Sequence, residues 1–397
     1  MIDLSEEDKL VRGAVRSWCT ELLDPAVDEL ERGVALPYPL MRDFAETFAL
    51  GELLTAKKRD AGGALGEGGG GGGEADRPRM SSKKARMLAL VMLELSRSCP
   101  GFALAFGATV GLFGAAVLAS GTPEQRERWA LPVLRFEKVG AWALTEPGAG
   151  SDAFGAMATR AERLGSNFRI HGEKTFITNA PFADVFVVYA KDEGRVRAFL
   201  VSRNDAGVTT GPAMRKMGMH ASPTGSLFLD GVVVPSDRLL GGEAAATSRS
   251  EAKSSLTAER FAMVPMALGI IERCLDESVR YAKERTQFGK AIAEFQLIQE
   301  KLARMHVAKT NLWALLLRQL EADASKTPLP PVDASAAKLY AARAATECAL
   351  EAVQIMGGAG YMAGSVVEMM ARDAKLLQIG GGTDEVQIGH IARALLA

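Results

Sequence analysis

The spacing of the hydrophobic residues changes twice along the chain, and this restricts the possible folds more than any other feature of the sequence. From residue 139 to about residue 239 they form short runs separated by Gly, Asn, Asp and Pro, as in strands joined by turns. Before and after this stretch they recur every three or four residues, as on one face of a helix. Because no helical segment lies between the strands, we expect an antiparallel barrel or sandwich with helical domains on both sides. The predicted strands are 168–171, 185–190, 198–201, 226–229 and 232–235.

The N-terminal part of the chain has the pattern of a series of helices. Helical spacing covers residues 5–48, and Pro25 and Pro37 are expected to divide it into separate helices. A further helix is expected over residues 123–134. Thr122 suits its N-cap, since a proline follows at the first helical position and a glutamate in the first turn.

Two stretches of unusual composition interrupt this pattern. Residues 102–120 carry no charge and reach the length of a membrane span. They are rich in Gly and Ala and poor in Leu and Ile, so we expect a helix buried in protein. Residues 61–76 include six consecutive glycines, 68–73, and predict a flexible loop, since glycine loses the most backbone entropy on ordering. A phosphate-binding loop is excluded because no Gly-Lys-Ser/Thr ending follows.

Composition excludes several classes of protein. The 397 residues are 48% hydrophobic, enough for large cores, and the net charge of −1 argues against a nucleic-acid or anionic membrane surface. The acidic start resembles neither a signal nor a transit peptide, so we expect a cytoplasmic protein. The cysteines and histidines lack metal-ligand spacing, and no metal site is predicted. These residues are Cys19, Cys99, Cys274, Cys348, His171, His220, His306 and His390.

The segment Ala141-Trp-Ala-Leu-Thr-Glu-Pro-Gly-Ala-Gly-Ser-Asp152 joins a strand-like run to a turn that contains two glycines. Such a turn lets the backbone approach a flat or anionic ligand, and hydroxyl and carboxylate groups lie beside it. Most turns of this kind bind nothing, so the segment alone is a weak indication. Four further motifs accompany it in order: Phe176-Ile-Thr-Asn179, Arg285-Thr-Gln-Phe-Gly289, Gln354-Ile-Met-Gly-Gly358 and Gly382-Thr-Asp-Glu385.

With these five motifs the sequence resembles the acyl-CoA dehydrogenase family, over most of its length after the first hundred residues. The resemblance implies an α+β, mainly α fold with a helical N-terminal domain, a central antiparallel β domain and a C-terminal four-helix bundle. We place these domains at residues 1–136, 137–241 and 242–397, with the glycine-rich loop at 61–76 in the first. It also implies FAD as cofactor, a homodimer or homotetramer, and electron-transfer flavoprotein as electron acceptor.

The resemblance assigns a group of residues to the flavin ring. Leu144, Thr145 and Ser151 would contact its pyrimidine side, with Ser151 also facing the substrate. Phe176 replaces a more usual tryptophan and would cover the ring, and Thr178 would bond near flavin N5. Outside the family context, Phe176 would be taken for a core residue.

A second group resembles positions that bind the adenosine diphosphate half of an FAD held mainly by a neighbouring subunit. A cation suits the pyrophosphate and glycine permits close approach. Taken alone, Arg285 would be a solvated cation at a helix end. This group consists of Arg285, Phe288, Gln296, Gln354 and Gly358, and Thr383 and Glu385 would close the site near the adenosine and ribityl parts.

The sequence departs from the common family pattern at the catalytic base. Most members carry Tyr-Glu-Gly-Thr near the C-terminus, whereas this chain has Gly380-Gly381-Gly382-Thr383. A branch that resembles isovaleryl-CoA and long-chain acyl-CoA dehydrogenases instead carries its glutamate in a Leu-x-x-Glu-Arg context, which here is Leu256-Thr-Ala-Glu259-Arg260. We therefore predict Glu259 as the base, although by itself it would be an ordinary acid near a helix N-terminus.

The resemblance implies an oxidoreductase that converts an acyl-CoA to the 2,3-enoyl-CoA in fatty-acid or branched-chain acyl metabolism. Glu259 would take the α-proton while the β-hydride moves to flavin N5. The backbone N–H of Gly381 would stabilise the thioester oxygen, and Leu256 and Arg260 would contact the substrate. Two alternatives remain open: a flavin oxidase or monooxygenase on the same fold, and a homologue that binds acyl thioesters without turnover. The acyl group, and CoA or acyl carrier protein as its carrier, are not determined by the sequence.

Overall fold

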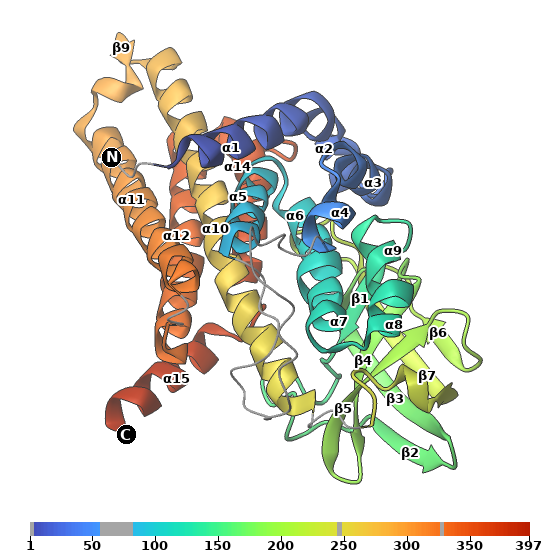
Figure 1. The fold of residues 1–397 in the computed structure, drawn as a ribbon. Coiled ribbons are helices and arrows are strands. Elements are labelled where there is room, and N and C mark those ends of the chain that lie inside the picture. The colour runs from blue at the N-terminus through green and yellow to red at the C-terminus, as the bar shows by residue number, and fades with distance from the viewer. Residues whose placement is uncertain (1–3, 56–81, 244–247, 326–328) are drawn as a thin grey trace, which may run out of the picture.

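The computed structural model describes residues 4–55, 82–243, 248–325 and 329–397, and the glycine-rich loop predicted at 61–76 lies outside these ranges. In the described residues, an N-terminal group of helices and a β domain lie on one side of a long C-terminal helical bundle (Figure 1). This is the mainly helical fold class that the sequence predicts.

The N-terminal helices begin with a capping box, in which Ser5 accepts from the backbone N–H of Asp8 and the Asp8 carboxylate accepts from the backbone N–H of Ser5. Pro25 does not interrupt the helical path, because it lies in the first turn of α2, which continues directly from a π-helical turn. The helices are α1 (Glu6–Trp18), the π-helical turn η1 (Cys19–Leu23), α2 (Asp24–Glu31), α3 (Tyr38–Thr47), α4 (Leu50–Thr55) and α5 (Ser82–Ser98).

The uncharged stretch predicted to be a buried helix forms α6 (Pro100–Gly107), the π-helical segment η3 (Ala108–Gly114) and α7 (Ala115–Ser120). It is the one helix of the described chain long and apolar enough to cross a membrane. Its phenylalanines are buried in the main core, among them Phe102 and Phe113, and its middle part packs on strand β1. After it, Thr122 caps the helical stretch α8 (Pro123–Gln125), η4 (Arg126–Ala130) and α9 (Leu131–Leu134) as predicted.

The β domain is a seven-stranded sheet with the order β1-β4-β2-β3-β7-β6, and β5 also pairs with β4. Most pairs are antiparallel, but β4 runs parallel to both β1 and β2, which the sequence did not predict. Neither parallel pair joins consecutive strands, because the β2–β3 hairpin separates β1 from β4 in the chain and β3 separates β2 from β4. The strands are β1 (Gly140–Ala143), β2 (Arg160–Leu164), β3 (Asn167–Thr178), β4 (Val185–Asp192), β5 (Arg195–Ser202), β6 (Val208–Thr210) and β7 (Thr224–Pro235), followed by the 3-10 turn η5 (Ser236–Arg238).

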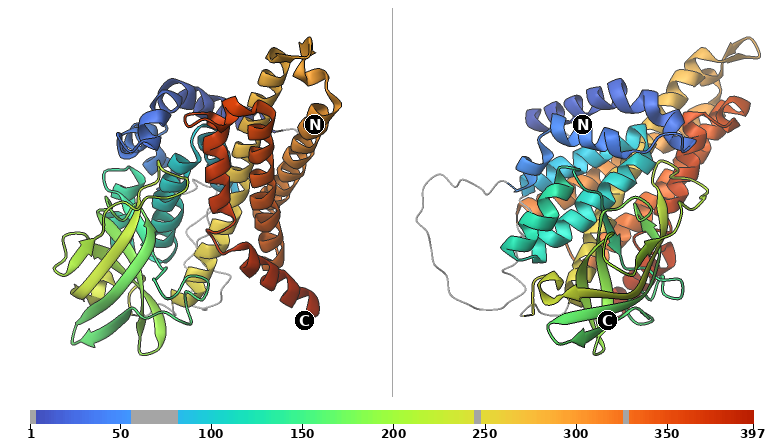
Figure 2. Two further views of the ribbon diagram at one scale, coloured as in Figure 1. Left: turned by 180° about the vertical axis from the view of Figure 1, so that it is seen from behind. Right: turned by 90° about the vertical axis from the view of Figure 1, so that its right-hand side faces the viewer.

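The C-terminal part is a bundle of long helices, whose central member α10 packs against α12, α11, α14 and the N-terminal α5. A short hairpin projects from one end of the bundle and α15 lies at the other end, as Figures 1 and 2 show. The elements are α10 (Ser248–Glu284), β8 (Thr286–Gln287), β9 (Lys290–Ala291), η6 (Ile292–Glu294), α11 (Gln296–Ala324), α12 (Pro331–Met356), α13 (Gly358–Tyr361), α14 (Val366–Leu377) and α15 (Asp384–Leu396).

Buried polar groups join the three parts. Asn179, at the end of β3, donates to Ala105 O at 2.9 Å and to Thr109 Oγ1 at 3.0 Å, so the motif asparagine attaches the sheet to η3 and α6. Asp373 of α14 accepts a hydrogen bond from the backbone N–H of Met219 in the β domain. Gly218 permits this approach, because a Cβ there would lie 2.6 Å from Asp373 Oδ1.

Candidate active site

A buried ion pair with strand β3 fixes the turn that follows β1. Lys174 of β3 is fully buried, and its Nζ lies 2.8 Å from Glu146 Oε1 and 3.1 Å from the carbonyl oxygen of Leu144. The backbone N–H of Thr175 donates to Thr145 O at 2.9 Å. Leu144 and Thr145, both predicted to contact the flavin, therefore have their backbone held rigidly against β3.

Hydrogen bonds keep Glu146 of this ion pair ionised although the pair is buried. Burial lowers the pKa of Lys174 to about 8, although the adjacent carboxylate opposes this. Burial also acts against the charge of Glu146, but hydrogen bonds from Lys174 and from the N–H groups of Ala158 and Thr159 bring its pKa below the ordinary value. The glutamate of the turn is thus a structural carboxylate that orders the loop around it.

Phe176 points outward because β3 is irregular at this place. The register between β3 and β7 shifts between Lys174 and Ile177, and Phe176 has a φ of +56°, which is rare for a residue with a side chain. Its ring is 67% exposed, although both neighbours in the strand are buried. Strained, outward-pointing residues of this kind concentrate at ligand sites.

The same face fits a flat cofactor with hydrogen-bonding edges. A Cβ added at Gly148 or Gly150 would meet nothing within 4 Å, so the turn leaves open space beside it. In the described part of the chain, the hydroxyls of Thr145, Ser151 and Thr178 make no hydrogen bond, and all three residues are at least partly exposed. An exposed aromatic ring, free hydroxyls and open glycines together suit the isoalloxazine of FAD.

A second cluster brings Glu259 of α10 against the glycine turn that precedes α15. A Cβ placed on Gly381 would lie 3.6 Å from both Cγ and Cδ of Glu259 and 3.5 Å from Cε of Met263. The two positions at which the family resemblance places the base thus lie next to each other. The N-terminal part of α10 lies between the β domain and α15 (Figures 1 and 2).

The turn itself is held by side chains from two helices. Nζ of the buried Lys338 donates to Gly382 O at 2.8 Å, and Gln387 Nε2 donates to Gly381 O and Gly382 O at 3.2 and 3.0 Å. Gly381 and Gly382 have φ values of +62° and +89°. The N–H of the buried Gly381 makes no hydrogen bond with the residues that the structure describes, so it is available to a ligand.

Electrostatics prepares Glu259 for proton transfer. Burial raises the pKa of Glu259 to about 7, and the nearby charges of Arg260 and Lys338 oppose the rise. Burial lowers the pKa of Arg260, whose Nε is inaccessible and makes no hydrogen bond within the described chain. Leu256, one helical turn earlier, is half-buried. A carboxylate with a pKa near 7 is suited to act as a general base.

Thr383 and Glu385 adjoin this cluster. Thr383 is the N-cap of α15, where its hydroxyl accepts from the N–H of Val386 at 3.3 Å, so it already has a structural role. Glu385 is exposed in the first turn of the same helix, and hydrogen bonds from its own N–H and from Thr383 lower the pKa of its carboxyl.

The remaining predicted residues lie at the opposite end of the bundle. Arg285 and Phe288 lie in the hairpin connection between α10 and α11, and Gln296 begins α11. Gln354 lies near the end of α12, and Gly358 begins α13. All five are exposed, Phe288 by 94% with a φ of +52°. At a rise of about 1.5 Å per residue, Arg285 lies roughly 39 Å from Glu259 along α10. Within a single chain, these five residues therefore lie far from the residues predicted to contact the flavin ring.

Sequence comparison identifies the class of protein that has this fold and this site. The chain matches the models of the acyl-CoA dehydrogenase N-terminal domain over residues 5–137, of the middle domain over 141–232 and of the C-terminal domain over 250–396. The chain therefore belongs to the acyl-CoA dehydrogenase family.

Individual relatives extend this finding. The chain is 34% identical to a 3-(aryl)acrylate reductase of Clostridium sporogenes and 33% identical to the caffeyl-CoA reductase-Etf complex subunit CarC of Acetobacterium woodii, in each case over 99% of both proteins. A glutaryl-CoA dehydrogenase of Mycobacterium smegmatis in complex with FADH2 has a TM-score of 0.87 at 28% identity, over 99% of this chain and 95% of that chain.

These matches confirm the predicted family, the FAD cofactor and the activity, FAD-dependent dehydrogenation of an acyl-CoA by an oxidoreductase. They do not favour the oxidase, monooxygenase or non-catalytic alternatives. The roles of the single site residues are not tested by the comparisons and stay predictions.

Several residues of the site were missed by sequence reasoning, namely Glu146, Lys174, Met263, Lys338 and Gln387. The strand alternation was the available indication for Lys174, which falls on the same buried face as Phe168 and Ile170. Lys338 lies among alanines in α12 and could have been noticed in the same way. Nothing in the sequence alone connects them to their partners, because these are 28 and 44 residues away.

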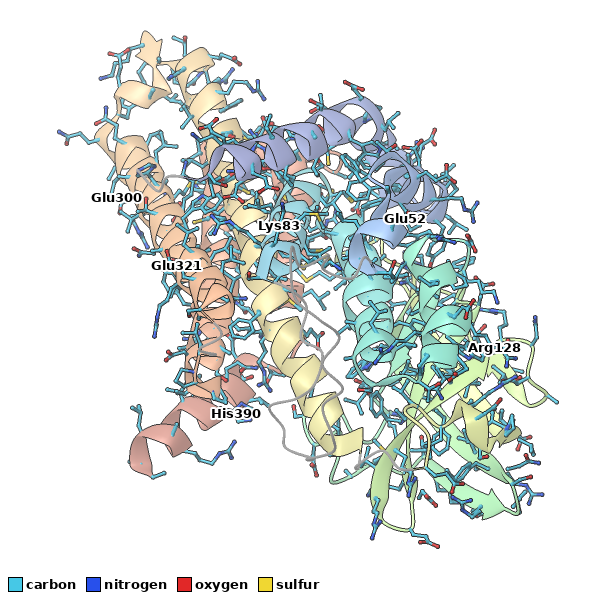
Figure 3. The ribbon with its side chains drawn as sticks, in the orientation of Figure 1. Glu52, Lys83, Arg128, Glu300, Glu321 and His390 are labelled. Atoms are coloured by element: carbon cyan, nitrogen blue, oxygen red, sulfur yellow. The ribbon has the colours of Figure 1, made fainter. Side chains whose placement is uncertain are left out.

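Other features of the described chain have no role assigned in the proposed chemistry. A surface hollow between α10 and α11 is lined by Leu275, Val279 and His306. It lies in the half of α10 next to the hairpin, whereas Glu259 lies in the other half. Glu300 and Glu321 mark the outer helix α11, and His390 lies on α15 (Figure 3). The His390 ring is 3.5 Å from Ser335 Oγ, and burial together with Arg260 and Arg393 lowers its pKa. No group of metal-ligating side chains occurs in the described residues.

Proposed function

We propose that Glu259 is the base that removes the α-proton of the acyl thioester. The observation that carries this assignment is its contact with Gly381, where the other branch of the family has its glutamate. Burial raises the pKa of Glu259 to about 7, which strengthens it as a base while about half of the carboxyl groups remain ionised at neutral pH. Because Gly381 has no side chain, no atom beyond its Cα lies between the backbone of the turn and the Glu259 carboxylate.

The α-proton of a thioester is only weakly acidic, so negative charge on the carbonyl oxygen must be stabilised as the proton leaves. The free N–H of Gly381, in a turn fixed by Lys338 and Gln387, would donate to that oxygen. FAD, when bound, supplies the acceptor of the β-hydride. Leu144, Thr145 and Phe176 would hold and cover its ring, with Thr178 at the edge nearest the reacting carbons.

The substrate class that we propose is an acyl-CoA with bulk at the β-carbon, such as a branched or aryl-substituted short chain. A Cβ at Gly380 would lie 3.6 to 4.0 Å from its three nearest described atoms, in ordinary contact only. Gly380 and Gly381 therefore leave room beside the base where most members carry a tyrosine and a glutamate. The similarity to an enzyme named 3-(aryl)acrylate reductase supports an aryl group.

Flavin reduction by a panel of acyl-CoAs tests this substrate class. We expect 3-phenylpropionyl-CoA and isovaleryl-CoA to reduce the flavin faster than butyryl-CoA and octanoyl-CoA. Gly380→Tyr should reverse that order, because its ring fills the open space; Gly380→Ala, which adds one methyl, is the matched control and should leave the order unchanged. A wild-type enzyme that prefers octanoyl-CoA would contradict the proposal.

We further propose a dimer or tetramer in which Arg285, Phe288, Gln296, Gln354 and Gly358 bind the adenosine diphosphate part of a neighbouring subunit's FAD. Their exposure at the far end of the bundle supports this arrangement. Arg285→Ala should then lower FAD content and weaken association together, as measured by absorbance and sedimentation. A fully flavinated, fully associated variant would contradict the shared site.

Electron transfer and location complete the proposal. We propose an electron-transfer flavoprotein as acceptor, in keeping with the Etf complex to which CarC belongs. The four cysteines are buried and unpaired in the described chain, which suits a cytoplasmic, reducing compartment. Reduction of a purified electron-transfer flavoprotein by substrate and enzyme under anaerobic conditions tests the first point; no reduction above the enzyme-free rate would contradict it.

A further inference from the structure

A fully buried lysine lies beneath the glycine turn of the proposed active site. Lys338 has no exposed surface, and its one hydrogen bond in the described structure goes to Gly382 O at 2.8 Å. Its Nζ is 3.9 Å from Asp384 Oδ1, too far for a hydrogen bond. Asp384 in turn bonds Arg343 Nε at 3.0 Å. The ammonium thus lacks a directly bonded counter-charge, which is unusual for a buried cation.

The charged groups around Lys338 come from two other helices. Asp384 and Glu385 belong to α15, and Glu259 and Arg260 belong to α10. Burial lowers the pKa of Lys338, while the three carboxylates oppose the change. Reciprocally, Lys338 stabilises the ionised form of Glu259. The lysine therefore acts on the carboxylate and on the glycine turn at once.

From this geometry we propose that Lys338 is a positioning residue for the dehydrogenation, which holds the Gly381–Gly382 turn by its hydrogen bond and keeps Glu259 ionised by its charge. The inference rests on the proposed role of Glu259 and goes beyond it. Because the hydrogen bond and the charge act on different groups, they can be separated by substitution.

The two functions have different kinetic signatures. Loss of the positive charge makes Glu259 harder to ionise, so the acid limb of the pH profile moves to higher pH. Loss of the hydrogen bond lets the turn shift, so the N–H of Gly381 no longer meets the thioester oxygen and the rate at high pH falls. If Lys338 only filled space, its substitution would change neither the acid limb of the pH profile nor the rate at high pH.

The experiment measures flavin reduction of the holoenzyme by its best acyl-CoA from about pH 5 to about pH 10, a range that extends to both sides of the Glu259 pKa of about 7. Lys338→Met removes charge and hydrogen bond, and Lys338→Gln removes the charge but keeps a donor. Both should move the acid limb up by about 1 pH unit. Only Lys338→Met should also lose at least about tenfold in the high-pH rate.

Two matched variants separate these effects from general damage. Gln387→Leu removes a neutral donor to the same carbonyls and should lower the high-pH rate without moving the limb. Lys375→Met removes an exposed lysine of α14 and should change neither. Thermal unfolding of the ligand-free variants against pH gives a readout independent of turnover. In Lys338→Gln, the pH range over which stability falls should extend upward, because Glu259 keeps its proton longer.

The outcomes are distinct. A Lys338→Gln enzyme with full FAD content and an unmoved acid limb would refute the electrostatic role, and an unchanged high-pH rate in Lys338→Met would refute the positioning role. If Glu259→Gln reduces its flavin at the wild-type rate, the base assignment itself fails, a result that does not depend on any Lys338 variant.

Discussion

Glu259 is a carboxylate in partly buried surroundings, and its pKa of about 7 reflects that burial. Glu259→Gln keeps the size of the side chain but removes the basic lone pair. We expect flavin reduction by the best acyl-CoA to fall by about a hundred- to ten-thousand-fold. Stopped-flow absorbance of the flavin measures the rate, and equilibrium binding of the acyl-CoA should be retained.

An exposed glutamate on the same helix provides the control. Glu284 lies at the far end of α10, where it forms a surface ion pair with Arg280 at 3.2 Å. Glu284→Gln should leave flavin reduction unchanged. Wild-type reduction by Glu259→Gln would overturn the assignment, and Asp384 and Glu385 would be the next carboxylates to test.

The contact between Glu259 and Gly381 makes a transfer of the base possible. Glu259→Gly with Gly381→Glu should recover part of the rate lost in the first substitution, because both positions reach the same space. Recovery should fall short by about a hundredfold, since a displacement near 1 Å has that effect. The φ of +62° at position 381 also strains any side chain there, by about 1 to 3 kcal/mol. Gly381→Ala measures this strain alone, by chemical denaturation; no recovery in a stable double variant would contradict the prediction.

At the scale of single residues, sequence reasoning paired two residues of the proposed site but did not find the side chains that hold them. Glu259 and Gly381 could be paired from two motifs, because a missing carboxylate at one place pointed to another. Lys338 and Gln387 could not, because a side chain that bonds a backbone carbonyl across the fold leaves no local pattern. The strain at Phe176 was equally invisible, since it depends on the register with β7.

Strand β3 carries the face predicted to contact the flavin, and its buried Lys174 joins that strand to the turn after β1. Lys174→Met should leave Glu146 as an unpaired buried carboxylate and lower the free energy of unfolding by about 3 to 5 kcal/mol. The double substitution Lys174→Met with Glu146→Gln should be less destabilising, because no charge remains buried. Urea denaturation monitored by tryptophan fluorescence measures both.

A partly exposed lysine of strand β4 is the matched comparison. Lys191 donates to Gly155 O at 2.9 Å at the protein surface, where it is partly exposed, so Lys191→Met should change stability by less than about 1 kcal/mol. Equal losses for Lys174→Met and the double substitution would show that the pair is not coupled.

Local patterns predicted the elements better than their connections. Thr122 and Pro123 defined a helix start because an N-cap and its first turn are contained in a few residues. Pro25 was expected to end a helix, yet it lies in the first turn of α2, where its missing N–H costs nothing. The parallel pairing of β1 with β4 was missed because it joins segments separated by a hairpin.

At the scale of the whole molecule, the motifs predicted three domains and a cofactor, but not the contacts between the domains. At their junction, Asp373 of α14 faces Met219 of the β domain and Glu31 of α2. Such contacts join residues more than 150 positions apart, and no periodicity in the sequence reports them. The junction nevertheless has a measurable property, because burial and the adjacent Glu31 raise the pKa of Asp373 to about 7.

The raised pKa values of Asp373 and Glu259 determine how stability depends on pH. Each carboxyl titrates near 7 in the folded chain, against 3.8 and 4.5 as ordinary values. Between about pH 5 and pH 7 the folded state therefore holds protons that the unfolded state has lost, and stability falls as pH rises, by up to about 1.4 kcal/mol per pH unit for each group. The lowered pKa of Glu146 acts in the opposite sense, but mainly below its ordinary value of 4.5.

Asp373→Asn should remove one of these two contributions, because the amide keeps an acceptor for the N–H of Met219 but does not titrate. Urea denaturation at pH 5, 6, 7 and 8, values chosen to span roughly this window, should show a shallower decline of stability for Asp373→Asn than for the wild type, and the variant should gain most above pH 7. Asp276→Asn, at a carboxylate whose side chain is 59% exposed, is the control and should reproduce the wild-type slope. If Asp373→Asn declines as steeply as the wild type, the proton is not held at the junction between the domains, and Glu259 alone would have to account for the pH dependence.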